Sequence, residues 1–83
     1  MGSNADYFII TVDDIHYNVD SITIKGNGKA KVIANDGKNK FARHFDKTLD
    51  FDVFQCEYRK NGEVFRFNAK FNKVIAEYIK YCI

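Results

Sequence analysis

The chain has 83 residues, which is room for one domain, and its formal net charge of +2 at pH 7 falls short of the strongly basic balance of many nucleic-acid-binding domains. No apolar run is long enough to predict a transmembrane helix or a signal-peptide core, and two cysteines exclude a disulfide-rich scaffold. Residues 1–5 (MGSNA) are small and polar and indicate a cloning remnant, so we expect a single cytoplasmic domain over residues 6–83.

Eight Phe and five Tyr have to supply most of the large core side chains, because Trp is absent and Met occurs once. The chain is also rich in Asn, Lys and Ile and contains no Pro. Such usage is typical of an A+T-rich gene, for which a low-GC bacterium, a plasmid or a phage would be a fitting source.

Short segments in the first half of the chain alternate apolar and polar residues, a pattern that predicts half-buried β-strands. The predicted strands are 7–12, 15–19, 22–25, 29–34 and 40–45. Asp20-Ser21 predicts a kink or bulge, so the second and third segments can form one strand. Turn-forming residues separate the others at 13–14, 26–28 and 35–38, and Asp36-Gly37 suits a type I′ turn.

The clearest signal in the sequence is the dipeptide Asn61-Gly62, the strongest short cue for a β-hairpin. It lies between 53–60 and 63–70, and a two-residue turn fixes the register of these two strands. On one face we expect an apolar set of pairs: Tyr58 with Phe65, Cys56 with Phe67, and Phe54 with Ala69. On the polar face Glu57 and Arg66 are then opposite one another, which predicts a cross-strand ion pair.

Residues 71–83 carry apolar side chains at helical spacing. The stripe consists of Phe71, Val74, Ile75, Tyr78, Ile79 and Cys82. We expect this helix to cover the apolar face of the hairpin. The predicted fold is therefore α+β, an antiparallel β-meander of five to six short strands with one C-terminal α-helix packed on one face. Cys56 and Cys82 are both expected to point inward, where a disulfide is geometrically conceivable.

The segment 46–52 is equally compatible with a loop, a helical turn or the start of a strand. It separates the first group of strands from the hairpin, so its conformation decides how the two groups are joined. The sequence gives no cue that would choose among the three structures.

Basic residues gather between positions 25 and 44, where Asp36 is the only acidic residue. This basic lobe consists of Lys25, Lys29, Lys31, Lys38, Lys40, Arg43 and His44. Lys25 and Lys29 are expected to face each other across a turn, and like charges in that position cost stability. The lobe can therefore be a site for an anionic partner, or a solvated hairpin whose lysines block edge-to-edge aggregation.

Acidic residues occupy most of the rest of the predicted exterior. A candidate acidic face consists of Asp13, Asp14, Asp20, Asp46, Asp50 and Asp52. Such a patch can dock onto the basic groove of another protein, or it can simply be a solvated surface.

Catalytic and cofactor motifs are absent from the sequence. Gly26-Asn27-Gly28-Lys29 lacks the spacing of a phosphate-binding loop, and it fits a hairpin turn. The residues His16, His44, Cys56 and Cys82 do not have the spacing of a zinc site. We therefore expect no enzyme, no metal and no cofactor.

These features predict a small non-enzymatic binding protein, an inhibitor or regulator that docks onto another protein or a protein–nucleic-acid complex. A phage or mobile element is a fitting origin. The alternative is a nucleic-acid-binding domain that uses the basic lobe. A homodimer through an exposed edge strand is also open, with 7–12 as the candidate edge because it carries no lysine. The sequence assigns the chain to no family.

Overall fold

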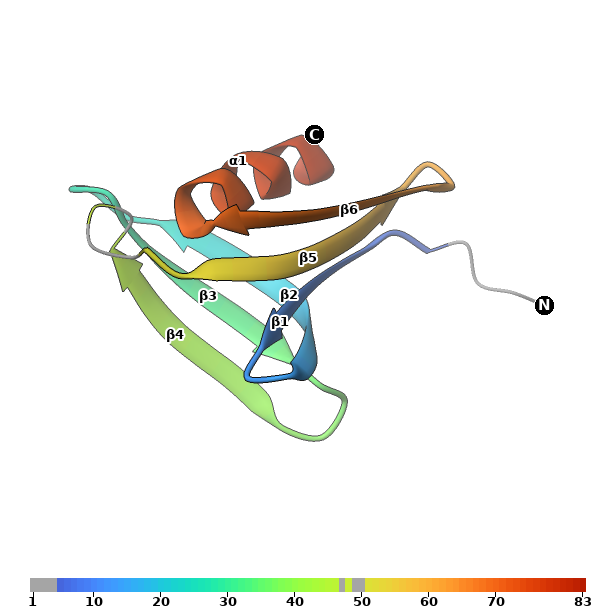
Figure 1. Cartoon of the computed structure of the whole chain (residues 1–83), viewed down its shortest axis with the longest axis horizontal. Coiled ribbons are helices and arrows are strands. Elements are labelled where there is room, and N and C mark those ends of the chain that lie inside the picture. Colours follow the sequence, from blue (N-terminus) through green and yellow to red (C-terminus); the bar gives the residue numbers. More distant parts are fainter. Residues whose placement is uncertain (1–4, 47, 49–50) are drawn as a thin grey trace.

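The computed structural model describes residues 5–46, 48 and 51–83. It shows an antiparallel sheet with one helix, which confirms the predicted α+β class (Figure 1). The elements are β1 (Tyr7–Val12), β2 (Ile15–Ile24), β3 (Lys29–Asn35), β4 (Lys40–Asp46), β5 (Val53–Lys60), β6 (Glu63–Lys70) and α1 (Phe71–Cys82). No helix in these described ranges is long and apolar enough to cross a membrane.

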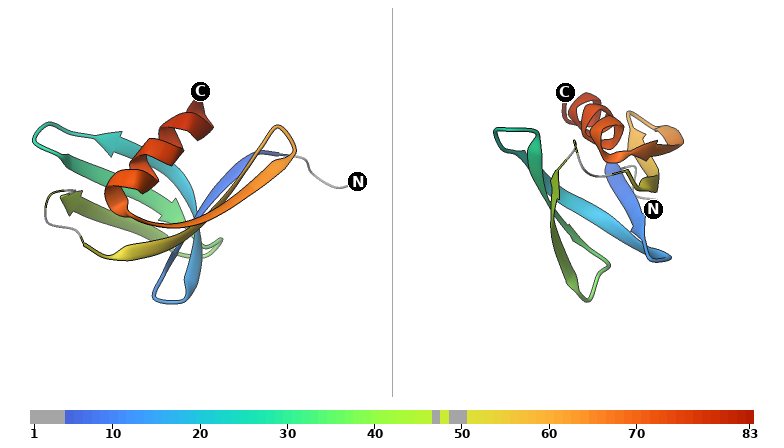
Figure 2. Two further views of the ribbon diagram at one scale, coloured as in Figure 1. Left: turned by 45° about the horizontal axis from the view of Figure 1, so that its top comes forward. Right: turned by 60° about the vertical axis from the view of Figure 1, so that its left-hand side comes forward.

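Strand β1 lies in the middle of the sheet, whose order is β4-β3-β2-β1-β5-β6. It pairs with β2 on one side and with β5 on the other. The prediction that 7–12 forms an open edge is therefore wrong, because residues far along the chain cover that edge. The edges are β4 and β6. The sheet is strongly twisted, and it bends around α1 (Figure 2).

The β5–β6 turn follows the predicted turn chemistry, whereas the β3–β4 connection departs from it. Asn61 and Gly62 have positive φ angles of 54° and 82°, as a type I′ turn requires. The β3–β4 connection, in contrast, is a four-residue loop, since Asn35 pairs with Lys40. The Oδ1 of Asp36 accepts hydrogen bonds from the backbone N–H groups of Lys38 and Asn39, which stabilises the longer loop.

A bulge interrupts β2, as Asp20-Ser21 predicted. The pairing with β3 shifts register between Val19 and Ser21, while the strand itself runs without a break. The register of the β5–β6 hairpin is also the predicted one, from Lys60 opposite Glu63 to Phe54 opposite Ala69.

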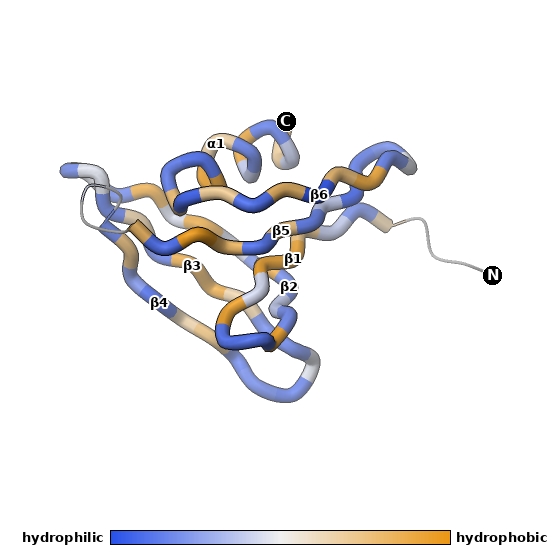
Figure 3. The backbone as a smooth tube through the Cα atoms, in the orientation of Figure 1, coloured by the Kyte–Doolittle hydropathy of each residue, from blue (hydrophilic) through white to orange (hydrophobic). Residues whose placement is uncertain are grey.

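The hydrophobic core lies between α1 and the face of the sheet that the helix covers, here called the inner face. Apolar residues alternate with polar ones along the strands, so each strand sends one set of side chains inward (Figure 3). Phe8, Val32, Phe71 and Val74 are at most 1% exposed. Phe45 stacks on Phe71, and Phe54 contacts both rings, so these three residues connect β4 and β5 to the helix.

The last turn of α1 departs from the predicted stripe. Ile79 is 44% exposed and Cys82 is exposed, whereas Tyr78 and Tyr81 pack around the ring of Phe8. The rings of Phe8 and Tyr58 in the sheet contact these tyrosines. In the last turn the buried face of the helix therefore includes Tyr81 in place of Cys82. The prediction that Cys82 points inward is therefore wrong, and both cysteines are free thiols.

Candidate functional site

The face of the sheet opposite α1, here called the outer face, is polar and lies across all the strands. The registers place one row of residues side by side on it. From β6 to β4 this row runs Arg66, Glu57, Ile9, Asn18, Asn35 and Lys40. Residues far apart in sequence are thereby brought onto one surface.

The basic lobe occupies the β3–β4 end of this face. Lys29 and Lys31 are two residues apart on β3, so their side chains leave the same face about 7 Å apart along the strand. His44 lies opposite Lys31, and Lys40 lies at the far end of β4. At the β2–β3 turn the backbone N–H of Lys25 donates to the carbonyl of Lys29 at 2.8 Å, which places these two lysines opposite each other as predicted.

None of the five lysines of the lobe has an ion-pair partner in the part of the chain that the structure describes. They are Lys25, Lys29, Lys31, Lys38 and Lys40. Cations elsewhere contact the fold more closely. Lys60 donates to the carbonyls of Lys80 and Ile83, and Arg66 and Lys80 pair with Glu57 and Glu77. Asp46 lies opposite Lys29 on β4, and the charge of Lys29 helps to lower the pKa of that carboxyl, so Lys29 is partly offset. The lobe still holds a strong excess of positive charge, because Asp36 is the only acidic residue between positions 25 and 44.

Arg43 is separated from the lysines that neighbour it in sequence. It lies on the edge strand β4 and on the inner face, with its guanidinium 4.5 Å from the ring centroid of Phe45. Its Nη2 is 3.9 Å from a carboxylate oxygen of Asp52. These contacts give Arg43 a structural role at the junction of β4 and β5.

The predicted acidic residues are spread over several elements. Two of them, and also Asp36 of the β3–β4 loop, accept hydrogen bonds from nearby donors. Asp20 accepts from the side-chain amide of Asn35 at 3.0 Å. The hydroxyl and backbone N–H of Thr48 donate to Asp46, which lowers the pKa of that carboxyl. Backbone N–H groups of Asn39 and Lys38 lower the pKa of Asp36.

The remaining acidic candidates do not join Asp20 and Asp46. Asp13 and Asp14 form the β1–β2 turn, both with positive φ, and Asp52 lies beside Arg43. Asp50 lies outside the described residues. The structure thus places the acidic candidates at separate points of the fold.

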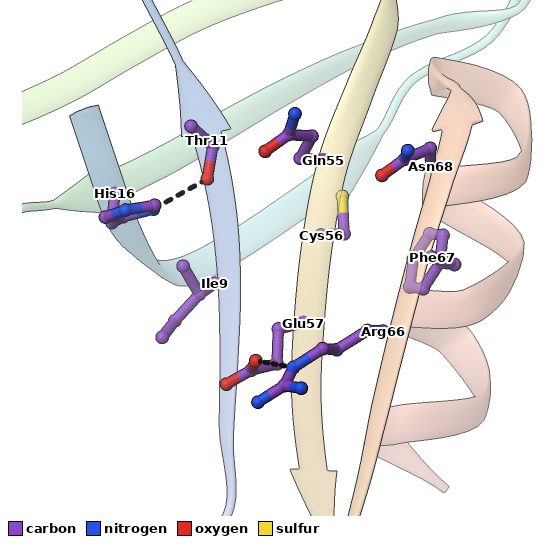
Figure 4. A pocket seen from close by; sticks show the side chains of 9 residues that line it. All are labelled: Ile9, Thr11, His16, Gln55, Cys56, Glu57, Arg66, Phe67 and Asn68. Carbon is purple, nitrogen blue, oxygen red and sulfur yellow. Dashed lines mark hydrogen bonds and ion pairs between the residues drawn. The ribbon is translucent and has the colours of Figure 1, made fainter. Parts of the chain in front are cut away.

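A polar hollow of about 430 Å³ lies on the outer face over β2, β1, β5 and β6 (Figure 4). Ile9 lines it together with six polar residues: Thr11, His16, Gln55, Glu57, Arg66 and Asn68. The sequence did not predict this hollow, because it depends on the pairing of β1 with β5. The alternation of polar residues in 53–60 and 63–70 was the one local signal for it.

Glu57 makes hydrogen bonds to two side chains at the polar hollow. It accepts from the Nε of Arg66 and, at 2.8 Å, from the hydroxyl of Tyr7. These contacts, that of Arg66 first, lower the pKa of Glu57, while the same carboxylate raises the pKa of Tyr7. At the other end of the hollow the hydroxyl of Thr11 lies 2.7 Å from Nδ1 of His16.

The hollow offers hydrogen-bonding groups but little for acid–base or nucleophilic chemistry. Burial raises the pKa of the Cys56 thiol to about 12, so it stays protonated and is a poor nucleophile near neutral pH. Glu57 is held as the carboxylate, which does not suit a general acid. Among the described residues no group of three or more His, Cys, Asp or Glu could hold a metal ion.

A second, smaller hollow of about 230 Å³ lies beside the β5–β6 turn. Its lining is Tyr58, Lys60, Asn61, Glu63, Phe65 and Lys80. Phe65 is 41% exposed there and stacks on Tyr58 with ring centroids 4.9 Å apart. This turn hollow opens on the inner face, and the polar hollow opens on the outer face, of the same edge strand.

Comparisons of the chain with protein-family models, with curated proteins and with solved structures each give no match.

Proposed function

We propose that this chain is a non-enzymatic binding protein that docks onto nucleic acid, with the lysines of its basic lobe against the phosphate backbone. The observation that carries this proposal is the state of those lysines. None of the five forms an ion pair in the described chain, and Lys25 and Lys29 face each other. Asp46, which lies opposite Lys29 on β4, offsets only part of this charge. A bound polyanion would relieve that repulsion.

The composition of the lobe favours phosphates over a protein surface. The centres of protein–protein interfaces are enriched in Tyr, Trp and Arg and depleted in Lys. The lobe has the opposite character, since Arg43 and the aromatic residues Phe41 and Phe45 all lie on the inner face. Without stacking platforms, contacts to the backbone of a duplex suit it better than bases of a single strand.

Binding without catalysis is supported by the chemistry of the polar hollow. The nearby thiol of Cys56 is protonated and buried in the core, and the carboxylate of Glu57 in the hollow is committed to Arg66 and Tyr7. A protein that covers the backbone in this way would inhibit or regulate enzymes that act on the same nucleic acid.

Fluorescence anisotropy with a labelled random-sequence DNA duplex tests the proposal. The chain should bind at about 50 mM salt, and log affinity should fall linearly with log salt with a slope of about −0.9 per phosphate contacted. The variant Lys29→Gln/Lys31→Gln should bind more weakly and reduce the magnitude of the slope by about 2.

The matched control is Lys73→Gln/Lys80→Gln, which removes the same charge from α1. It should bind as the unaltered chain does. Equal weakening of both double variants would show that net charge alone drives binding, and it would contradict a site at the lobe. Absence of duplex binding at about 50 mM salt would contradict the proposed function itself.

A further inference from the structure

The open edge of β6 presents backbone groups that no strand of the sheet satisfies. The two-residue turn at Asn61-Gly62 makes Lys60 and Glu63 a hydrogen-bonded pair, and such pairs alternate along the hairpin. It follows that Val64, Arg66 and Asn68 direct their N–H and C=O groups away from β5. An eight-residue strand with a free row of this kind is a template for another strand.

The polar hollow and the turn hollow both flank this edge. Arg66 and Asn68 line the polar hollow on the outer face, whereas Glu63 and Phe65 line the turn hollow on the inner face. An added strand would direct successive side chains alternately to the two faces. The edge thus has the two features of a strand-addition site: free backbone groups for hydrogen bonds, and hollows on both faces for alternate side chains.

We propose that the edge of β6 binds an extended acidic segment of another protein, which joins the sheet beside β6. Its acidic side chains would lie on the outer face against Arg66, which pairs with Glu57 through Nε but whose side chain is 79% exposed. Its intervening apolar or aromatic side chains would lie against Phe65. The ammonium groups of Lys60 and Lys80 border the turn hollow and add to the attraction for a negative segment.

A second copy of the chain suits this edge less well. Self-pairing of β6 would bring Arg66 and Lys70 of both copies onto one ladder, with Glu63 as the single acid on each strand. Like charges on neighbouring strands destabilise such a pairing. The surface is also distinct from the basic lobe, which lies at the other end of the strand order.

A labelled peptide that alternates Glu with Phe, and a control peptide with Lys in place of every Glu, test the inference. The acidic peptide should bind, and hydrogen exchange of the Val64, Arg66 and Asn68 amides should slow at least about tenfold on binding. The control peptide should bind at least about tenfold more weakly.

Proline variants test whether the peptide binds at the edge of β6 or elsewhere on the sheet. Asn68→Pro removes an N–H that points away from β5 and leaves the hairpin ladder intact. It should weaken peptide binding by about tenfold or more, the effect of one lost hydrogen bond. Ala42→Pro makes the matched change on the other edge strand, β4, and should leave binding unaltered.

If Asn68→Pro does not fold, Phe65→Ser keeps every backbone group of the hairpin, and it should lower the affinity through the turn hollow alone. Four results would overturn the inference: no binding of the acidic peptide, equal binding of both peptides, equal loss in both proline variants, or loss in neither. Protection of the same three amides without peptide, together with a dimeric mass, would identify a second copy as the occupant and overturn it too. None of these results bears on duplex binding by the lobe.

Discussion

Phe45 of β4 stacks on Phe71 of α1, with ring centroids 3.8 Å apart and planes 13° from parallel. Phe54 of β5 meets both rings at an angle. Since β4 and β5 are separated by three strands in the sheet, this cluster links two strands that are not neighbours. The shape of the outer face, including the position of the basic lobe, therefore depends on an apolar contact on the opposite side.

Replacement of the central ring should be costly. Phe71→Ala should lower the free energy of unfolding by about 3–5 kcal/mol, because it removes a ring that is fully buried between two others. Urea denaturation followed by circular dichroism measures this loss. Phe51, at 70% exposed, gives the control, and Phe51→Ala should change stability by less than about 1 kcal/mol.

The Glu57–Arg66 pair should make stability depend on pH. The folded-state pKa of Glu57 is lowered, so its contribution is present above the unfolded value of about 4.5 and is lost as pH falls through the folded value. The variant Glu57→Gln should therefore lose less stability than the unaltered chain below that pH. Thermal unfolding across acid pH measures the difference, and parallel curves would contradict a role for Glu57.

The two cysteines should react at very different rates. Cys82 is exposed, whereas Cys56 is buried and burial raises its pKa to about 12. Iodoacetamide at neutral pH should therefore add one label to the folded chain and two in denaturant, as counted by mass spectrometry. In Cys82→Ser the folded chain should take up no label, and rapid labelling of this variant would disagree with the buried position of Cys56.

Gly62 and Gly26 should differ in their tolerance of alanine. Gly62 has φ of 82° in the hairpin turn, where an added Cβ is strained even though nothing lies within 4 Å of it. Gly62→Ala should cost about 1 kcal/mol in chemical denaturation. Gly26 also has open space around it but no such φ, so Gly26→Ala should be close to neutral.

Local sequence signals were enough to predict the hairpin and most of the strands. Asn61-Gly62 fixed the register of β5 and β6, and with it the Glu57–Arg66 pair. The bulge of β2 was also marked locally, by Asp20-Ser21. In each case the residues that form the structure are close in sequence, so a local sequence pattern is enough to predict the turn or the bulge.

The features that sequence missed depend on contacts between distant residues. The pairing of Ile9 with Glu57 creates the polar hollow, and no local pattern specifies that β1 joins β5 rather than forming an edge. Arg43 is a different case, because strand alternation in β4 already puts it on the face of Phe41 and Phe45, where it lies over the ring of Phe45. The exposure of Cys82, in contrast, follows from the packing of Tyr81 on Phe8.

The central position of β1 has a consequence for synthesis on the ribosome. The four strands from β1 to β4 can pair as soon as they emerge, but the free side of β1 stays uncovered until Lys60 has also left the exit tunnel. Closing that gap joins segments nearly fifty residues apart, and such non-local pairing slows folding. The nascent chain thus passes through an intermediate in which the apolar strand β1 has one unpaired edge. This intermediate is prone to aggregate, and a chaperone would act on it most usefully.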